Sequence, residues 1–225
     1  MATALAFDIY GTLIDTHGVV ARLQLLVGEQ AAQFSRVWRE KQLEYSFRRG
    51  LMQCYENFDV CTQQALEYTC QLLKFSLSAE VKSELMALYR KLPAFDDVAT
   101  GLEMAKGFGF YRYAFSNGLK SSVEALLVNA GIIHQFDAVV SVDQQQTFKP
   151  NPLVYKALAG NMPQPGGSIW LVSSNPFDVI GAISAGLKAA WIQRQADAVF
   201  DPWGIEPTLV ASTLPNAIQA INKSQ

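Results

Sequence analysis

Short apolar runs alternate with amphipathic stretches over most of the chain. Runs typical of buried strands cover residues 4–10, 110–115, 138–142, 169–172 and 189–193. Amphipathic patterns typical of helices separate the later runs, at about residues 120–130, 153–158 and 177–185. Because this alternation indicates βαβ units, we predict an α/β fold with a doubly wound parallel sheet, right-handed crossovers and helices on both faces.

Between the first two runs, helical spacing replaces the alternation. Ser78 followed by Glu80 is typical of a helix start, and Leu92 before Pro93 is typical of a helix stop. We therefore predict a core domain made of residues 1–15 and 96–225, with a helical insertion of residues 16–95.

Composition and charge narrow the class of protein. Of the 225 residues, 50% are hydrophobic and 17% are charged, which is typical of a chain that folds around its own core. The net charge of -2 and the lack of dense Lys/Arg runs argue against nucleic acid or an anionic membrane as partner and favour a small molecule. The start of the chain does not resemble a signal peptide, and no apolar run reaches the ~18 residues of a membrane span, so we expect a cytoplasmic protein.

Histidine and cysteine motifs typical of common hydrolases are not found in the sequence. The two histidines, His17 and His134, lie in no Gly-x-Ser-x-Gly or His-Glu-x-x-His motif. Cys54, Cys61 and Cys70 show no Cys-x-x-Cys spacing, so we expect no zinc site. The sequence therefore favours a carboxylate as nucleophile.

Polar side chains follow several apolar segments directly. Asp8 lies at the end of the first run, Ser116 and Asn117 follow the second, and Lys149 and residues 173–175 follow later segments. The carboxyl ends of parallel strands share one edge of the sheet, where ligands bind, so we predict that these segments converge on one site. On its own, Asp8 also suits a structural role as acceptor for the amides of the next turn.

Four of these segments, in their order and placement, resemble the motifs of the haloacid dehalogenase superfamily: DIYGTL at 8–13, SNG at 116–118, KP at 149–150 and SSNPFD at 173–178. Within the insertion, WREKQLEY at 38–45 resembles the cap signature of one branch, the L-2-haloacid dehalogenases. Asn57-Phe58 and Ala65-Leu66 resemble its next cap segment. The resemblance spans nearly the whole chain and implies a Rossmann-like core with a helical cap, a homodimer and no cofactor.

The leaving group distinguishes the dehalogenases from the phosphatases of the superfamily. An alkoxide must be protonated as it leaves, and the phosphatases use a second aspartate two positions after the nucleophile, where this chain has Tyr10. Phosphatases also need further carboxylates to hold Mg²⁺, and the last motif offers only Asp178. Chloride or bromide needs neither a proton nor a metal. We therefore predict metal-independent hydrolysis of short (S)-2-haloacids to (R)-2-hydroxyacids.

The resemblance implies a role for each matching residue. Asp8 is the expected nucleophile, which forms an ester with inversion at the carbon that carried the halogen. Arg39 holds the substrate and receives the halide. Ser116 and the amide of Asn117 bind the substrate carboxylate.

Further residues are expected to support Asp8 or to form the pocket. Lys149 keeps Asp8 ionised, and Asp178 activates the water that hydrolyses the ester. The remaining expected residues are Thr12 as anchor of the loop, Tyr155 as a partner of Lys149 or Asp178, Ser173 and Asn175 as hydrogen-bonding supports, Ile9 as a further substrate-binding residue, and a pocket wall of Tyr10, Leu43, Phe58 and Phe177. Pro176 departs from the small residue expected there and removes one backbone donor.

Plainer roles compete with several of these assignments. Arg39 also suits a solvated helix face, Lys149 a surface turn, and Tyr155 the core. Ser173 and Asn175 are also typical helix N-caps.

Two other functions also compete. One is a phosphatase with a degenerate metal site, which a chelator would inhibit. The other is a silent binding protein that keeps the carboxylate pocket without turnover.

Overall fold

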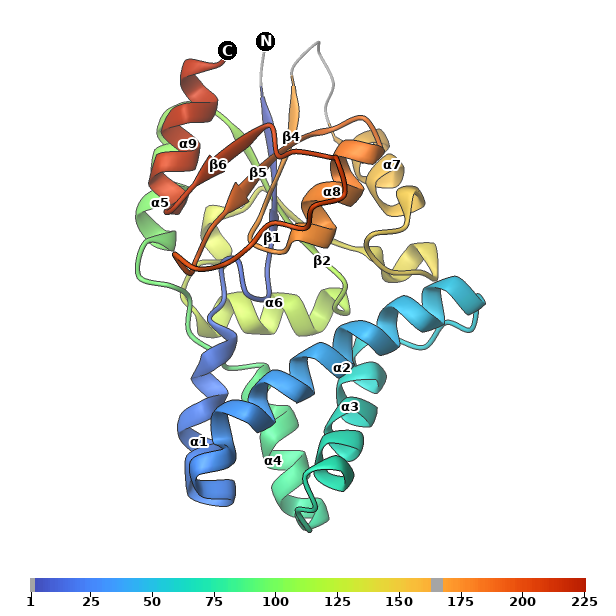
Figure 1. Ribbon diagram of the computed structural model, residues 1–225. Helices are drawn as coiled ribbons and strands as arrows, with labels where there is room; N and C mark the ends of the chain where they lie inside the picture. The colour runs from blue at the N-terminus through green and yellow to red at the C-terminus, as the bar shows by residue number, and fades with distance from the viewer. Residues whose placement is uncertain (1–2, 163–167) are drawn as a thin grey trace.

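The computed structural model describes residues 3–162 and 168–225 and contains a six-stranded parallel sheet (Figure 1). In sheet order the strands are β3 (Ala138–Ser141), β2 (Tyr111–Ser116), β1 (Ala4–Asp8), β4 (Ile169–Ser173), β5 (Lys188–Ile192) and β6 (Leu209–Ala211). The chain order reverses beside β1, the position at which α/β sheets bind ligands. The predicted doubly wound α/β fold is confirmed.

Helices cover both faces of the sheet because each strand places alternate side chains on opposite faces. Leu5 and Phe7 of β1 belong to one hydrophobic cluster, and Ala4 and Ala6 to the other. The first cluster includes side chains of α5 (Val98–Gly107), α6 (Lys120–Asn129) and α9 (Leu214–Lys223), and the second those of α7 (Pro152–Asn161) and α8 (Pro176–Ser184). Burial on both faces explains the nearly continuous apolar run of β1.

The predicted strands coincide with β1 to β5, and the predicted core helices with α6, α7 and α8. The sequence analysis missed α5, β6 and α9. Strand β6 is three residues long and lies at the edge of the sheet, so it has little pattern to detect. Helix α9 carried a readable signal, because Thr213 caps it and Leu214, Ala217, Ile218 and Ile221 form one buried stripe.

Four helices form a separate layer below the carboxyl edge of the sheet in Figure 1. They are α1 (Val20–Val27), α2 (Ala31–Met52), α3 (Phe58–Leu72) and α4 (Ala79–Tyr89). Ser78 caps α4 by accepting a hydrogen bond from the amide of Val81, which confirms the predicted helix start. The buried Trp38 indole donates to the carbonyl of Thr62 at 2.9 Å and so joins α2 to α3. Over the two described ranges, no helix is both long and apolar enough to cross a membrane.

The chain leaves and re-enters the sheet layer at one place, shortly after Asp8. The amide of Asp15 donates to the carbonyl of Pro93 at 2.9 Å, and the amide of Phe95 donates to the carbonyl of Leu13 at 3.0 Å. These paired crossings hold the four helices over the edge of the sheet where the predicted site residues lie.

Close packing of α5 on α9 predicts the effect of a substitution at Gly101. A Cβ added there would stand 2.6 Å from Cγ of Leu214. Overpacking costs about 1–3 kcal/mol, of which improved helix propensity offsets up to about 1 kcal/mol. We expect Gly101→Ala to lower the free energy of unfolding in urea. Gly107→Ala, in the same helix, is the control because its Cβ would meet nothing within 4 Å. Equal effects of the two substitutions would contradict the packing argument.

Candidate active site

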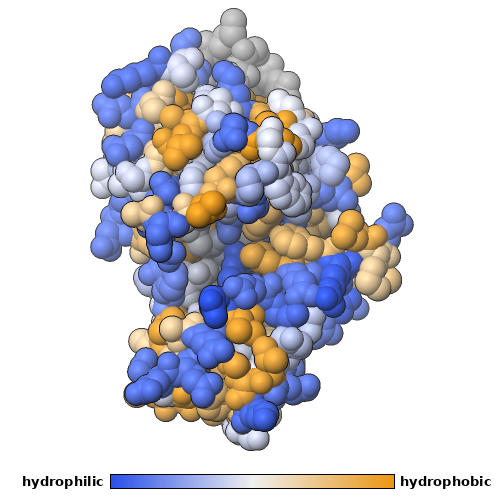
Figure 2. All heavy atoms as spheres, viewed as in Figure 1, coloured by the Kyte–Doolittle hydropathy of each residue, from blue (hydrophilic) through white to orange (hydrophobic). Residues whose placement is uncertain are grey.

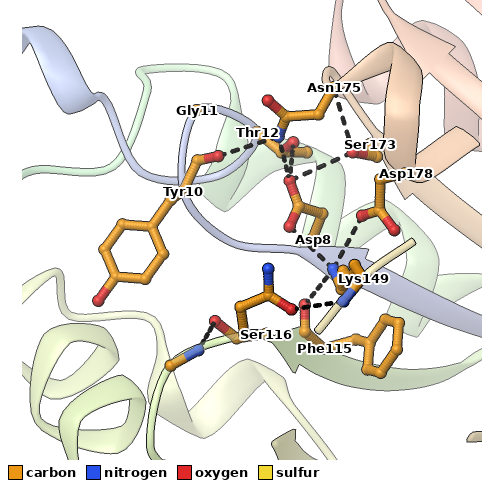
Figure 3. A network of polar contacts seen from close by, with 12 residues as sticks. Asp8, Tyr10, Gly11, Thr12, Phe115, Ser116, Lys149, Ser173, Asn175 and Asp178 are labelled. Atoms are coloured by element: carbon orange, nitrogen blue, oxygen red, sulfur yellow. Dashed lines mark hydrogen bonds and ion pairs between the residues drawn. The ribbon is translucent and has the colours of Figure 1, made fainter. Parts of the chain in front are cut away.

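The ends of β1, β2 and β4 and the loop before α7 bring the predicted polar residues together (Figure 3). Asp8, Ser116 and Ser173 are the last residues of their strands, and Lys149 reaches Asp8 from the loop. The convergence predicted from the parallel topology is therefore observed.

Lys149 lies at the centre of this cluster. Its Nζ donates to Oδ1 of Asp8 at 2.9 Å, to Oδ2 of Asp178 at 2.8 Å and to the carbonyl of Phe115 at 2.9 Å. The residue is 1% exposed, and its Nζ lies 4.2 Å from the centroid of the Phe115 ring. The ammonium thus has an acceptor for each of its three hydrogens. Lys149 is not the surface turn residue that its sequence context also allowed.

Asp8 is held on both carboxylate oxygens. While Oδ1 faces Lys149, Oδ2 accepts from the hydroxyl of Thr12 at 2.7 Å, from Nδ2 of Asn175 at 2.7 Å and from the hydroxyl of Ser173 at 3.2 Å. Burial opposes ionisation, but Lys149 and the Thr12 hydrogen bond outweigh it and lower the pKa of Asp8 below its usual value. Asp8 is therefore an ionised and oriented carboxylate.

Asn175 shows how the structure separates two interpretations of one residue. It occupies the N-cap position of α8, but its side chain makes no capping hydrogen bond. Its amide nitrogen donates instead to Asp8 and, at 3.2 Å, to the carbonyl of Tyr10. The side chain serves the carboxylate rather than the helix.

Asp178 is a second buried carboxylate with a different environment. Its Oδ2 faces Lys149, and its Oδ1 accepts from the hydroxyl of Tyr155 at 2.6 Å. Burial and the nearby charge of Asp8 raise the pKa of Asp178 to about 6, against the opposing attraction of Lys149. A carboxyl group that titrates near neutral pH is suited to general base catalysis.

Asp8 faces a small cavity between the sheet and the helical layer. Its lining consists of Asp8, Tyr10, Arg39, Leu43, Phe58, Ser116, Asn117, Lys149, Asn175 and Phe177. A wider hollow lies on the other side of the loop at Gly11, but Asp8 does not line it. We assign the chemistry to the small cavity because it alone of the two reaches the carboxylate.

Arg39 brings a positive charge to this cavity from helix α2. Its Nη1 donates to Oε1 of Gln42 at 2.7 Å, and its Nη2 lies 3.4 Å from the carbonyl of Tyr10. Gln42 is 1% exposed and was missed by the sequence analysis. An uncharged polar residue one turn from Arg39 on a buried helix face was the available signal.

Not every predicted residue lines the cavity. Thr12, Tyr155, Ser173 and Asp178 lie behind Asp8 and Lys149 and act through the hydrogen bonds described above. The side chain of Ile9 is fully buried in the hydrophobic core and forms no part of the cavity wall.

The two remaining polar residues of the wall already have partners. The hydroxyl of Ser116 accepts from the amide of Gly118 at 3.1 Å, and Oδ1 of Asn117 accepts from the amide of Lys149 at 2.9 Å. These bonds leave the Ser116 hydroxyl hydrogen free to point toward an anion in the cavity.

Tyr10 replaces the second aspartate of the phosphatase pattern. In Figure 3 its ring points away from Asp8, and it lies beside Phe58 and Tyr89 with centroids 6.1 and 6.4 Å apart. Burial raises the pKa of Tyr10, which makes its proton harder to donate. Among the described residues, no three His, Cys, Asp or Glu side chains are grouped to hold a metal ion.

Comparison with known proteins places the chain among relatives of one activity. The sequence model of the haloacid dehalogenase-like hydrolases matches residues 2–186. An (S)-2-haloacid dehalogenase of Pseudomonas putida is 38% identical over 93% of this chain and 92% of its own length. Haloacetate dehalogenase H-2 of Moraxella sp. (strain B) is 34% identical over 97% of both chains. The structure of L-2-haloacid dehalogenase from Xanthobacter autotrophicus with chloropropionic acid covalently bound matches with a TM-score of 0.90 and 29% identity over 100% of each chain.

The ion cluster predicts how the loss of its cation affects stability. Lys149→Met leaves two buried carboxylates without a cation, and removing one partner of a buried pair costs about 3–5 kcal/mol. Without Lys149, burial and the mutual repulsion of the two carboxylates favour their neutral forms, so we expect protonation of these groups to stabilise the fold at low pH. We therefore expect the stability deficit, measured by urea unfolding, to be larger at pH 7.5 than at pH 4.5.

The matched control is Lys120→Met, which removes an exposed lysine 3.9 Å from Glu124. For this variant the decrease in the free energy of unfolding should stay below about 1 kcal/mol at both pH values. A pH-independent deficit for Lys149→Met would contradict the proposed charge balance of the cluster.

Proposed function

From its membership of the haloacid dehalogenase-like hydrolases, within the (S)-2-haloacid dehalogenases, we infer that this chain hydrolyses short (S)-2-haloacids to (R)-2-hydroxyacids and halide. The observation that carries the inference is an ionised carboxylate, Asp8, held by Lys149 and facing a cavity lined by Arg39.

The first step is displacement at carbon. An oxygen of Asp8 attacks C2 of the substrate opposite the halogen, the new C–O bond forms as the carbon–halogen bond breaks, and the halide leaves with the bonding electrons. Ser116 and the backbone of Asn117 hold the substrate carboxylate, while the guanidinium of Arg39 receives the halide. Attack from the opposite side inverts the configuration at C2.

Exclusion of water makes Asp8 a better nucleophile. The helical insertion contributes Leu43 and Phe58 to the cavity, and Phe177 adds a third apolar wall. Fixed donors on Asp8 replace the hydration that would otherwise stabilise its ground state. We propose residues 16–95 as the cap domain that provides this closure over a core of residues 1–15 and 96–225.

The second step is hydrolysis of the Asp8 ester. Water attacks the side-chain carbonyl carbon of Asp8 and Asp178 accepts one of its protons. The bond from this carbon to the ester oxygen then breaks as the alkoxide takes up that proton from Asp178, and the second proton of water is released when the Asp8 carboxyl ionises again. The product therefore leaves with an oxygen that belonged to Asp8, and Asp8 keeps the oxygen of water. Thr12 and Asn175 donate to the oxyanion that forms during the attack.

The first step prepares the base for the second. Esterification removes the negative charge of Asp8, which is one of the causes that raise the pKa of Asp178. Lys149 then has a single buried carboxylate as ionic partner. The pKa of Asp178 consequently falls, so Asp178 is ionised when water must be activated.

The partner is thus a small-molecule 2-haloacid, and we also propose a homodimer in the cytoplasm. Exposed apolar side chains support self-association, since Leu51 and Met52 at the end of α2 are 85% and 67% exposed. Figure 2 shows apolar side chains gathered at this free end of α2.

One turnover with enzyme in excess over 2-chloropropionate in H₂¹⁸O tests the covalent route. We expect the first hydroxyacid to carry no label, and the label to appear in the peptide that contains Asp8. Asp8→Ala should release no halide, and EDTA should leave the wild-type rate unchanged. Label in the first product would establish direct attack by water, and release of phosphate from a phosphate ester, abolished by EDTA, would favour a metal-dependent phosphatase.

The pKa of Asp178 predicts the pH dependence of the second step. Ester hydrolysis requires ionised Asp178, so its rate should fall as pH decreases, with a midpoint at about 6 or below. In Asp178→Asn this step should slow by at least about 100-fold, and the alkylated peptide should accumulate. Rapid quench and mass spectrometry at pH 5 to 8 measure both effects. Fast hydrolysis in the variant would remove Asp178 from the mechanism.

A further inference from the structure

Arg194, just beyond the end of β5, binds the backbone of the loop that carries Asp8. Its Nε and Nη2 both donate to the carbonyl of Thr12, at 3.1 and 2.6 Å. Its Nη1 donates to both carboxylate oxygens of Asp97, at 2.7 and 2.8 Å. The guanidinium therefore joins residues 12 and 97, which are far apart in the sequence.

Both ends of this connection are themselves fixed. The hydroxyl of Thr12 donates to Asp8, so the residue whose carbonyl binds Arg194 also holds the nucleophile. Asp97 accepts a further hydrogen bond from the amide of Leu214 at 2.7 Å. The guanidinium also stacks on Phe95, with its central carbon 4.3 Å from the ring centroid.

The contacts are shielded from solvent. The side chains of Arg194 and Asp97 are 14% and 21% exposed, so water and salt screen their attraction less than they screen an exposed pair. Arg194 does not line the cavity at Asp8 and lines the hollow behind the loop instead. It cannot touch a substrate held at Asp8.

The location also couples the nucleophile to the insertion. Thr12 lies just before the point where the chain leaves the sheet layer for the insertion, and Asp97 lies just after the point where it returns. The two segments are hydrogen-bonded to each other between Leu13 and Phe95. Arg194 thus binds both of these segments, on the side of the loop opposite the cavity.

We propose that Arg194 is a positioning residue, which sets the attack geometry of Asp8 through Thr12 and locks it to the base of the helical insertion. The inference rests on the proposed function. Arginine suits the task because its planar fork can serve a carbonyl and a carboxylate at once, whereas the compact ammonium of lysine cannot reach both in this geometry.

The test compares Arg194→Gln with Arg112→Gln. Arg112 is the matched control because it is 12% exposed, pairs with Asp137 at 2.9 Å and donates to the carbonyl of Gln135 at 2.6 Å, but lies at the start of β2, far from Asp8 along the strand. Both variants lose a shielded ion pair, so a purely structural role would affect them alike.

For Arg194→Gln we expect the alkylation rate constant for 2-chloropropionate to fall on the order of 10- to 100-fold, because small misplacements of reacting groups are costly. KM should change by less than about twofold, since no substrate contact is lost. Arg194→Lys should recover part of the rate. Arg112→Gln should keep the wild-type rate constant at a temperature where each variant is folded.

Hydrogen exchange measures the loop without any turnover. Amides of residues 9–15 should exchange faster in Arg194→Gln and unchanged in Arg112→Gln. Wild-type kinetics in Arg194→Gln together with unchanged exchange, or equal slowing in both variants, would overturn the proposal. If the wild-type protein releases no halide, the proposed function fails, while exchange still reports whether Arg194 holds the loop.

Discussion

A single buried ammonium group makes the site possible. Two carboxylates within hydrogen-bonding distance of the same nitrogen would repel each other strongly in a dry environment, and burial would favour their neutral forms. The positive charge of Lys149 compensates for this repulsion and burial, but to a different extent for the two carboxylates. The pKa of Asp8 is lowered, and that of Asp178 is raised to about 6. Two chemically identical side chains thus acquire different pKa values, which suits them to the proposed tasks of nucleophile and base.

Parallel topology explains why so few contacts are needed to assemble this cluster. Asp8 ends β1, Ser116 ends the neighbouring β2, and Ser173 ends β4 on the other side of β1. Sheet hydrogen bonds therefore fix the spacing of these residues before any side chain interacts. Trp191 of β5 extends this support, since its indole donates to the carbonyl of Ser174 at 3.0 Å.

Sequence reasoning identified the elements that have a strong pattern and the residues that belong to a motif. Most of the sheet and the cluster around Asp8 could be predicted because apolar runs and polar strand ends are local features. Arg194 could not be found in this way, because its importance arises from a contact with Thr12 that is made only in the folded chain. A motif also does not show which face of the chain each member occupies, and the side chain of Ile9 faces the hydrophobic core.

The two layers of the molecule divide the chemistry between them. Asp8, Lys149 and Asp178 belong to the sheet layer and interact without help from the insertion. Arg39, Leu43 and Phe58 come from the helical layer and line the cavity. Substitutions of Leu43 or Phe58 therefore change the apolar lining without removing a charge near Asp8, whereas loss of Arg39 removes one of the charges that lower the pKa of Asp8. The apolar lining alone is not sufficient, because excluding water from the cavity makes Asp8 more reactive only while its carboxylate remains ionised.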